Sequence, residues 1–162
     1  MCTVAHPVAL EDAFRRHYPA LRAKCRRMLR DPQEADDVAQ ETFVRLWKSN
    51  LAGGDDRMVT AWIYKTSNRV AIDRLRASAT RLRLAPPPEE RSTDMAGSLE
   101  VKAQLDRLAA TMPEDELELV LLQRWDGLTH AEIAEVTGQS ERTVRRRLKS
   151  SEERLAQLAK ES

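Results

Sequence analysis

The chain has 162 residues, of which 33% are charged, 41% are hydrophobic and only 4% are aromatic. This length suits one domain or two small ones, and no apolar run reaches the about 18–20 residues that a membrane-spanning helix needs. The first residues lack the basic start and apolar stretch of a secretion signal, and Cys2 and Cys25 are too few for a disulfide framework. We therefore expect a cytoplasmic protein that does not insert into a membrane and is not mainly β.

The net charge of +1 hides an uneven distribution of charge along the chain. Residues 1–85 carry 16 Lys and Arg against 10 Asp and Glu, residues 86–118 carry 3 against 9, and residues 119–162 carry 8 against 7. A basic first part suggests a polyanionic partner such as nucleic acid. Ordinary solvated helix faces explain the same composition equally well.

Two amphipathic helices are predicted near the start of the chain. Apolar residues recur at steps of three and four over residues 10–29, and Pro19 inside this stretch is expected to end or kink the helix. Asp31 followed by Pro32 is typical of a helix start, because Asp31 caps free amides and Pro32 fits the first turn. The apolar stripe of this second helix is expected to continue to Trp47.

A loop with two glycines over residues 50–56 precedes a third predicted helix, for which Thr60 is the expected cap. Three consecutive prolines and a run of small and acidic residues then interrupt the helical pattern, because proline lacks the amide donor of a helix. We interpret this segment as a flexible linker between two small helical bundles. The predicted all-α organisation is a domain over residues 1–84, a linker over residues 85–98 and a domain over residues 99–162.

The second domain carries the pattern of a helix-turn-helix. Thr129 and Glu132 have the spacing of a capping box that opens a short helix. Gly138 follows where the turn between the helices needs a positive φ, and Ser140 is placed to cap the next helix.

This next helix has a basic outer face. Its apolar period turns Val144 and Leu148 inward, which leaves Arg142, Arg146 and Lys149 outward. Such a helix fits the major groove of DNA, where arginine pairs with guanine or holds phosphates. A structural helical hairpin with an exposed basic face is the alternative interpretation.

Two further motifs reduce the number of possible functions. Residues 36–47 read DDVAQETFVRLW and residues 61–76 read AWIYKTSNRVAIDRLR. Both resemble the core domain of bacterial extracytoplasmic-function (ECF) sigma factors of the sigma-70 family, and residues 99–158 resemble the C-terminal domain of that family. The resemblance implies a subunit that binds core RNA polymerase and promoter DNA and directs promoter-specific transcription initiation. It implies no enzymatic activity and no cofactor, and it adds an anti-sigma factor as a further partner.

The resemblance also assigns residues to these roles. The helix matching residues 32–48 docks on the largest polymerase subunit in the family, through positions that correspond here to Asp37, Gln40, Glu41 and Arg45. The helix matching residues 61–76 reads and melts the −10 element, through positions that correspond here to Lys65, Asn68, Arg69, Arg74 and Arg76. The last predicted helix reads the −35 element, with candidate contacts Ser140, Arg142, Thr143, Arg145, Arg146 and Lys149.

The residues alone do not exclude other functions. A classical helix-turn-helix regulator that acts without core polymerase would share the second domain. A magnesium-dependent nucleotide hydrolase needs clustered carboxylates, and three fall on one helical face: Glu34, Asp37 and Glu41. The four residues that could be considered for a zinc site match no standard zinc spacing, so no metal is expected: Cys2, His6, His17 and Cys25.

Overall fold

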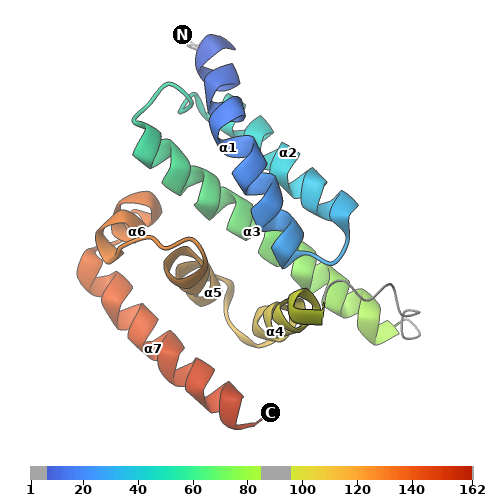
Figure 1. Ribbon diagram of the computed structural model, residues 1–162. Helices are drawn as coiled ribbons and strands as arrows, with labels where there is room; N and C mark the ends of the chain where they lie inside the picture. Colours follow the sequence, from blue (N-terminus) through green and yellow to red (C-terminus); the bar gives the residue numbers. More distant parts are fainter. Residues whose placement is uncertain (1–6, 85–95, 162) are drawn as a thin grey trace.

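The computed structural model describes residues 7–84 and 96–161, and every regular element in these two ranges is helical (Figure 1). The helices in chain order are α1 (Pro7–Met28), α2 (Pro32–Ser49), α3 (Asp56–Leu84), α4 (Ala96–Thr111), α5 (Glu114–Val120), the π turn η1 (Leu121–Trp125), α6 (His130–Thr137) and α7 (Glu141–Lys160). The predicted all-α class is confirmed. None of the described helices combines the length and hydropathy needed to cross a lipid bilayer.

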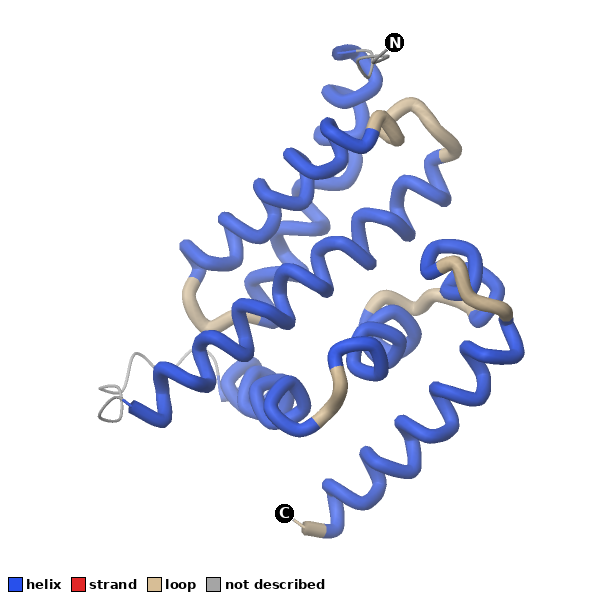
Figure 2. The backbone as a smooth tube through the Cα atoms, turned by 180° about the vertical axis from the view of Figure 1, so that it is seen from behind, coloured by secondary structure: helices blue, strands red, loops and turns tan. Residues whose placement is uncertain are grey.

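The first half is a bundle of the three long helices α1, α2 and α3, each of which packs against the other two (Figure 2). The side chains between them are apolar and fully buried, among them Leu21, Val38, Leu46 and Ile63. The predicted start of α2 is confirmed, since the Asp31 carboxylate accepts the amide hydrogen of Gln33 at 2.9 Å and Pro32 is the first helical residue.

The helix predicted to end or kink at Pro19 instead continues through it as one α1. The proline removes one backbone hydrogen bond, but packing on both sides of it keeps the helix together. The Tyr18 ring stacks on Phe14 with centroids 4.4 Å apart and meets Phe43 of α2 edge-on at 5.8 Å, while Leu21 is fully buried. α1 therefore does not end at Pro19, so that form of the prediction is wrong, while a kink at Pro19 stays a prediction.

Two other local predictions for the first half are also wrong. α3 begins at Asp56, because the Asp55 carboxylate accepts the amide hydrogen of Arg57 at 3.0 Å and so acts in place of Thr60 as the cap. Thr60 lies in the second turn, and its hydroxyl donates to the Asp56 carbonyl at 2.8 Å. The buried stripe of α2 ends at Leu46, and the Trp47 side chain is 50% exposed.

The predicted helix-turn-helix is confirmed in α6 and α7. The Thr129 hydroxyl accepts the amide hydrogen of Glu132 at 3.2 Å, and the Glu132 carboxylate accepts that of Thr129 at 2.8 Å. Gly138 has a φ of +69°, a conformation that suits glycine, and Ser140 caps α7 by accepting the amide hydrogen of Thr143 at 3.1 Å.

The two halves are packed against each other along α3. Helices α6, α5 and α4 follow one another beside α3, and α7 lies on the outer side of this row (Figures 1 and 2). Their buried apolar side chains form one continuous cluster with those of the first bundle. α4 begins at Ala96, within the segment that the sequence assigned to the linker, and the rest of that segment up to residue 95 lies outside the described residues.

Candidate nucleic-acid interface

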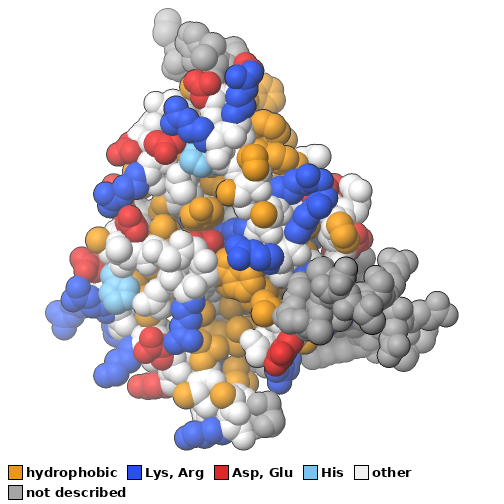
Figure 3. Space-filling view, viewed as in Figure 1, with side chains coloured by type: hydrophobic (Ala, Val, Ile, Leu, Met, Phe, Trp, Pro, Cys, Tyr) orange, Lys and Arg blue, Asp and Glu red, His pale blue; other side chains and the backbone are white. Residues whose placement is uncertain are grey.

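The outer face of α7 is basic and open to solvent. Val144, Leu148 and Ser151 of the same helix are buried against the second half, which turns the opposite side outward. Four exposed cations lie on or beside this outward side: Arg142, Arg145, Arg146 and Lys149. Blue side chains gather around α6 and the start of α7 at the lower left of Figure 3. This face has the shape and charge for the backbone and major groove of duplex DNA.

The two remaining −35 candidates, Ser140 and Thr143, hydrogen-bond with each other at the start of α7. Ser140 is exposed, and its hydroxyl accepts the amide hydrogen of Thr143 while donating to the Thr143 hydroxyl at 2.8 Å. Arg145 pairs with Glu141 one turn earlier at 2.6 Å, a pair whose side chains are both well exposed. Such surface pairs contribute little, so Arg145 remains available to a phosphate.

A second candidate surface lies on α2. Gln40 and Arg45 are exposed, and Asp37 and Glu41 are half-buried. Glu41 pairs with Arg45 at 2.8 Å, and Arg74 of α3 lies 3.9 Å from the other oxygen of the Glu41 carboxylate. The structure thus brings together on one face the four residues that the resemblance assigned to polymerase binding, with Arg74 beside them.

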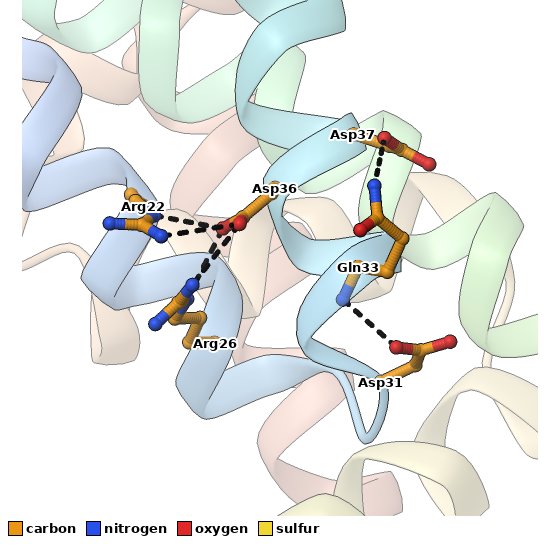
Figure 4. Close-up of polar contacts among 6 residues, drawn as sticks. All are labelled: Arg22, Arg26, Asp31, Gln33, Asp36 and Asp37. Atoms are coloured by element: carbon orange, nitrogen blue, oxygen red, sulfur yellow. Dashed lines mark hydrogen bonds and ion pairs between the residues drawn. The ribbon is translucent and has the colours of Figure 1, made fainter.

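Asp36, the neighbour of Asp37, fixes α2 to α1 (Figure 4). Its carboxylate accepts hydrogen bonds from Arg22 at 2.9 and 3.3 Å and from Arg26 at 3.1 Å through two nitrogens. The two guanidinium groups hold the pKa of Asp36 far below its ordinary value, mainly through the hydrogen bonds from Arg22 and then from Arg26. Asp37 instead accepts from Gln33 of its own helix at 3.3 Å. Adjacent carboxylates therefore have separate roles, one within the bundle and one toward the outside.

We expect Asp36→Asn to destabilise the bundle in a pH-dependent way. A carboxyl group with a lowered pKa stabilises the folded state above its ordinary pKa of about 3.9, and this contribution fades as the pH falls below that value. The difference in unfolding free energy between wild type and Asp36→Asn should be largest near neutral pH and should shrink in acid. Urea denaturation at several pH values measures it, with Asp73→Asn on the exposed side of α3 as the control. A difference that does not change with pH would contradict the role of Asp36.

On α3, Asn68 is buried against the second half of the chain, and Arg69 contacts that half while its side chain stays 48% exposed. Asn68 is 0% exposed, and its amide nitrogen donates to Asp126 at 2.8 Å. Arg69 donates two hydrogen bonds to the buried carboxylate of Glu118, at 2.9 and 3.2 Å. The hydrogen bond to Glu118 is the main reason that the pKa of Arg69 is raised.

Arg76 is also engaged by the second half. It donates to the carbonyl oxygens of Ala109 and Met112, each at 3.0 Å, and pairs with Glu114 at 3.6 Å. Lys65 is half-buried on the same helix. The structure therefore does not bring the five predicted −10 residues together on one open face, because Asn68 is buried and the partly exposed Arg69 and Arg76 pair with groups of the second half.

A buried ion pair lies beside Asn68 and joins the two halves. The Lys24 ammonium group of α1 is 2.7 Å from the Asp126 carboxylate, and the exposed fractions of the two side chains are 4% and 2%. Lys24 also donates to the Ser67 hydroxyl at 3.3 Å and lies over the Tyr64 ring, 4.8 Å from its centroid. Burial lowers the pKa of Lys24, and the Asp126 charge opposes that effect.

The local backbone explains why Asp126 points at α3. After α5 the α-helix gives way to the wider π turn η1, where the Asp126 amide donates to the Leu121 carbonyl at 3.0 Å. Gly127 then reverses the chain with a φ of +73°, which confirms the predicted helix stop. The sequence indicated that stop, but it held no sign that Asp126 and Lys24 would meet. The period of the apolar residues over 10–29 places Lys24 on the polar side of its helix, where a solvent-exposed side chain is expected.

Comparisons with known proteins decide among the functions that the sequence left open. Residues 13–81 match the family described as Sigma-70 region 2, and residues 102–155 match Sigma-70, region 4. The chain is 30% identical over 155 residues to the ferric citrate uptake sigma factor FecI of Escherichia coli, covering 89% of this chain and 87% of that protein. It is 28% identical over 159 residues to the ECF RNA polymerase sigma factor SigL of Mycobacterium tuberculosis, covering 91% and 90%.

The chain belongs to the ECF sigma factors of the sigma-70 family. As a sigma factor it binds core RNA polymerase and promoter DNA and directs promoter-specific transcription initiation, and sigma factors are not enzymes. The region 2 match lies on α1 to α3 and the region 4 match on α4 to α7. The basic face of α7 therefore lies in region 4, and α3 lies in region 2.

The described part of this sigma factor brings no three His, Cys, Asp or Glu side chains together as a metal site. Cys25 is buried, and burial raises the pKa of its thiol to about 11, so the thiol is neutral at physiological pH. His17 hydrogen-bonds to Asp56 at 3.1 Å. Cys2 and His6, the other members of the zinc alternative, lie outside the described residues.

Proposed function

We propose that this sigma factor contacts its promoter and its polymerase through three separate helices: α7 for the −35 element, α3 for the −10 element and α2 for the polymerase. The domains predicted over residues 1–84 and 99–162, joined by the linker over 85–98, would carry these roles. The observation that carries the proposal is the exposed basic face of α7 behind a capped start and the supporting helix α6. A helix in this setting enters a major groove with its first turns.

The mixed charges on α2 support polymerase docking. Gln40, Glu41 and Arg45 present both donors and acceptors on a helix that Asp36 anchors to α1, so that the face is preorganised. Charged surfaces of this kind mainly raise the rate of association and fix the orientation of the complex.

For α3 we propose binding and strand capture. Asn68, which occupies the family's asparagine position, would hydrogen-bond an extruded base or the adjacent backbone. Lys65, Arg69, Arg74 and Arg76 would hold phosphates. The few kcal/mol needed to unstack a base are offset by contacts to the captured strand.

We further infer that the protein acts in the cytoplasm, where its promoter and the polymerase are found. An anti-sigma factor remains a predicted partner. Its presence would be supported by a second protein that co-purifies with this chain and prevents it from binding core polymerase.

Transcription in vitro with core RNA polymerase on genomic fragments tests the proposed function. The purified chain should start transcripts from a limited set of fragments that share −35 and −10 elements, whereas core polymerase alone should not. A chain that binds duplex DNA but neither binds core polymerase nor starts transcripts would support the regulator alternative instead.

We expect Arg146→Ala to weaken −35 recognition by about 1–3 kcal/mol, because a bidentate arginine–guanine contact contributes that much discrimination. The measurement is the affinity of the holoenzyme for a promoter fragment identified by transcription and for the same fragment with an altered −35 element. Lys160→Ala, which removes one positive charge near the other end of α7, is the control. An equal loss on both fragments would show that Arg146 contacts phosphate and does not read bases.

A further inference from the structure

We propose that Glu141, at the start of α7, is a specificity-determining residue that reads a cytosine in the −35 element. This inference rests on the −35 role proposed for α7, and it goes beyond that role by assigning a base to a residue that is not a cation. The position of the Glu141 carboxylate and its contact with Arg145 support it.

Glu141 is an acidic residue on a strongly basic part of the chain. Residues 140–149 include five lysines and arginines, and Glu141 is their single acidic residue. It is the first helical residue of α7 and is exposed between the −35 candidates Ser140 and Arg142. Because the first turns of such a helix enter the major groove, this carboxylate would lie beside the edges of the bases. The phosphates repel a carboxylate there, so a specific contact is needed to compensate.

The capping of α7 does not explain the direction of the Glu141 side chain. The Ser140 hydroxyl caps the helix by accepting the amide hydrogen of Thr143. The helix dipole favours an acidic residue in the first turn, but it does not require the side chain to point along the helix. The Glu141 carboxylate does so, and its Oε1 accepts a hydrogen bond from Arg145 at 2.6 Å. Glu141 and Arg145 therefore lie together on one edge of the proposed reading helix.

Arg145 makes the Glu141 carboxylate compatible with DNA. The Arg145 side chain is 65% exposed and that of Glu141 is 45% exposed. Glu141 engages one guanidinium nitrogen, Nη2, so the other N–H groups of Arg145 can reach a phosphate. The charge of Arg145 then offsets the repulsion between the carboxylate and the DNA backbone. The second carboxylate oxygen of Glu141, Oε2, accepts no hydrogen bond from the described residues and is available to a base.

A carboxylate oxygen can only accept hydrogen bonds, and this restricts the base that Glu141 can read. In the major groove guanine and thymine present acceptors, and the amino groups of cytosine and adenine are the donors. Adenine carries its N7 acceptor beside the amino group, which repels a carboxylate, whereas cytosine presents the amino group alone. Glu141 therefore favours cytosine, while the arginines of the same helix are suited to guanine and to phosphate.

The test compares the sequence preferences of holoenzymes that carry wild-type, Glu141→Gln or Glu141→Ala sigma factor. Binding is measured to a promoter fragment identified by transcription and to fragments with each single base-pair change in its −35 element. Wild type should favour cytosine at one position by about tenfold. Glu141→Gln should change the preference at that position to adenine, because glutamine pairs with the N6 and N7 atoms of adenine. Glu141→Ala should abolish the preference there and keep the preferences at the other positions.

Glu152→Gln is the matched control, because Glu152 is an exposed glutamate later on α7 that pairs with Arg124 within the second half. It should leave every base preference unchanged. If Glu141→Gln keeps the wild-type preferences, or changes the affinity for all fragments equally, its carboxylate does not read a base and the inference is refuted, while the −35 role of α7 stands. If neither Arg142→Ala nor Arg146→Ala weakens binding to the promoter fragment, the −35 role of α7 is itself refuted.

Discussion

Lys24→Met is expected to lower the free energy of unfolding by about 3–5 kcal/mol, because it leaves the Asp126 carboxylate buried without its counter-ion. Methionine keeps the length of the side chain and suits a helix, so the lost charge is the main change. Urea denaturation followed by circular dichroism measures the effect.

The double variant Lys24→Met/Asp126→Asn provides the matched comparison. It buries no charge, and the new amide can still hydrogen-bond with Asn68, so most of the lost stability should return. Lys48→Met on the exposed end of α2 is the control for the substitution itself. If Lys24→Met costs no more than Lys48→Met, the buried pair does not connect the two halves as the structure indicates.

Asp37→Lys is expected to weaken binding to core RNA polymerase by about a hundredfold or more. Reversing a charge in a complementary interface places like charges together, which costs several kcal/mol. Asp37 lies on the α2 face that we propose as the docking surface, beside Gln40 and Glu41. The affinity is measured with labelled sigma factor and core enzyme at a fixed salt concentration.

Asp12→Lys makes the same change of charge on the exposed side of α1 and should leave the affinity nearly unchanged. Helical content that matches wild type in both variants would exclude unfolding as the cause. Equal affinities for Asp37→Lys and wild type would move the docking surface away from α2.

Local signals in the sequence predicted the individual helices well where a cap or a turn decides the structure. Asp31, Thr129, Gly138 and Ser140 each act within a few residues, so their roles follow from spacing alone. Pro19 shows the limit of such reasoning, because contacts from Phe43 on another helix help to hold α1 together across it.

The arrangement of the two halves could not be predicted in this way. Asn68 and Lys24 lie on the polar sides of their helices by period, and both are buried because Asp126 reaches them from a segment far along the chain. Charge segregation was the one available signal. It predicted a polyanionic partner for the basic half, and in the structure five cations of that half pair with carboxylates of the second half.

The central claim is that α3 opens the −10 element of the promoter while α2 holds the polymerase. The most direct test is promoter opening by the holoenzyme that carries Asn68→Ala, followed through the permanganate reactivity of unpaired thymines on a promoter mapped by transcription. The variant should bind core polymerase as tightly as wild type and should open the promoter poorly, because α3 loses the side chain proposed to contact an extruded base. Helical content that matches wild type would show that losing the hydrogen bond to Asp126 has not unfolded the chain. Normal opening by the variant, or loss of its binding to polymerase, would contradict this claim.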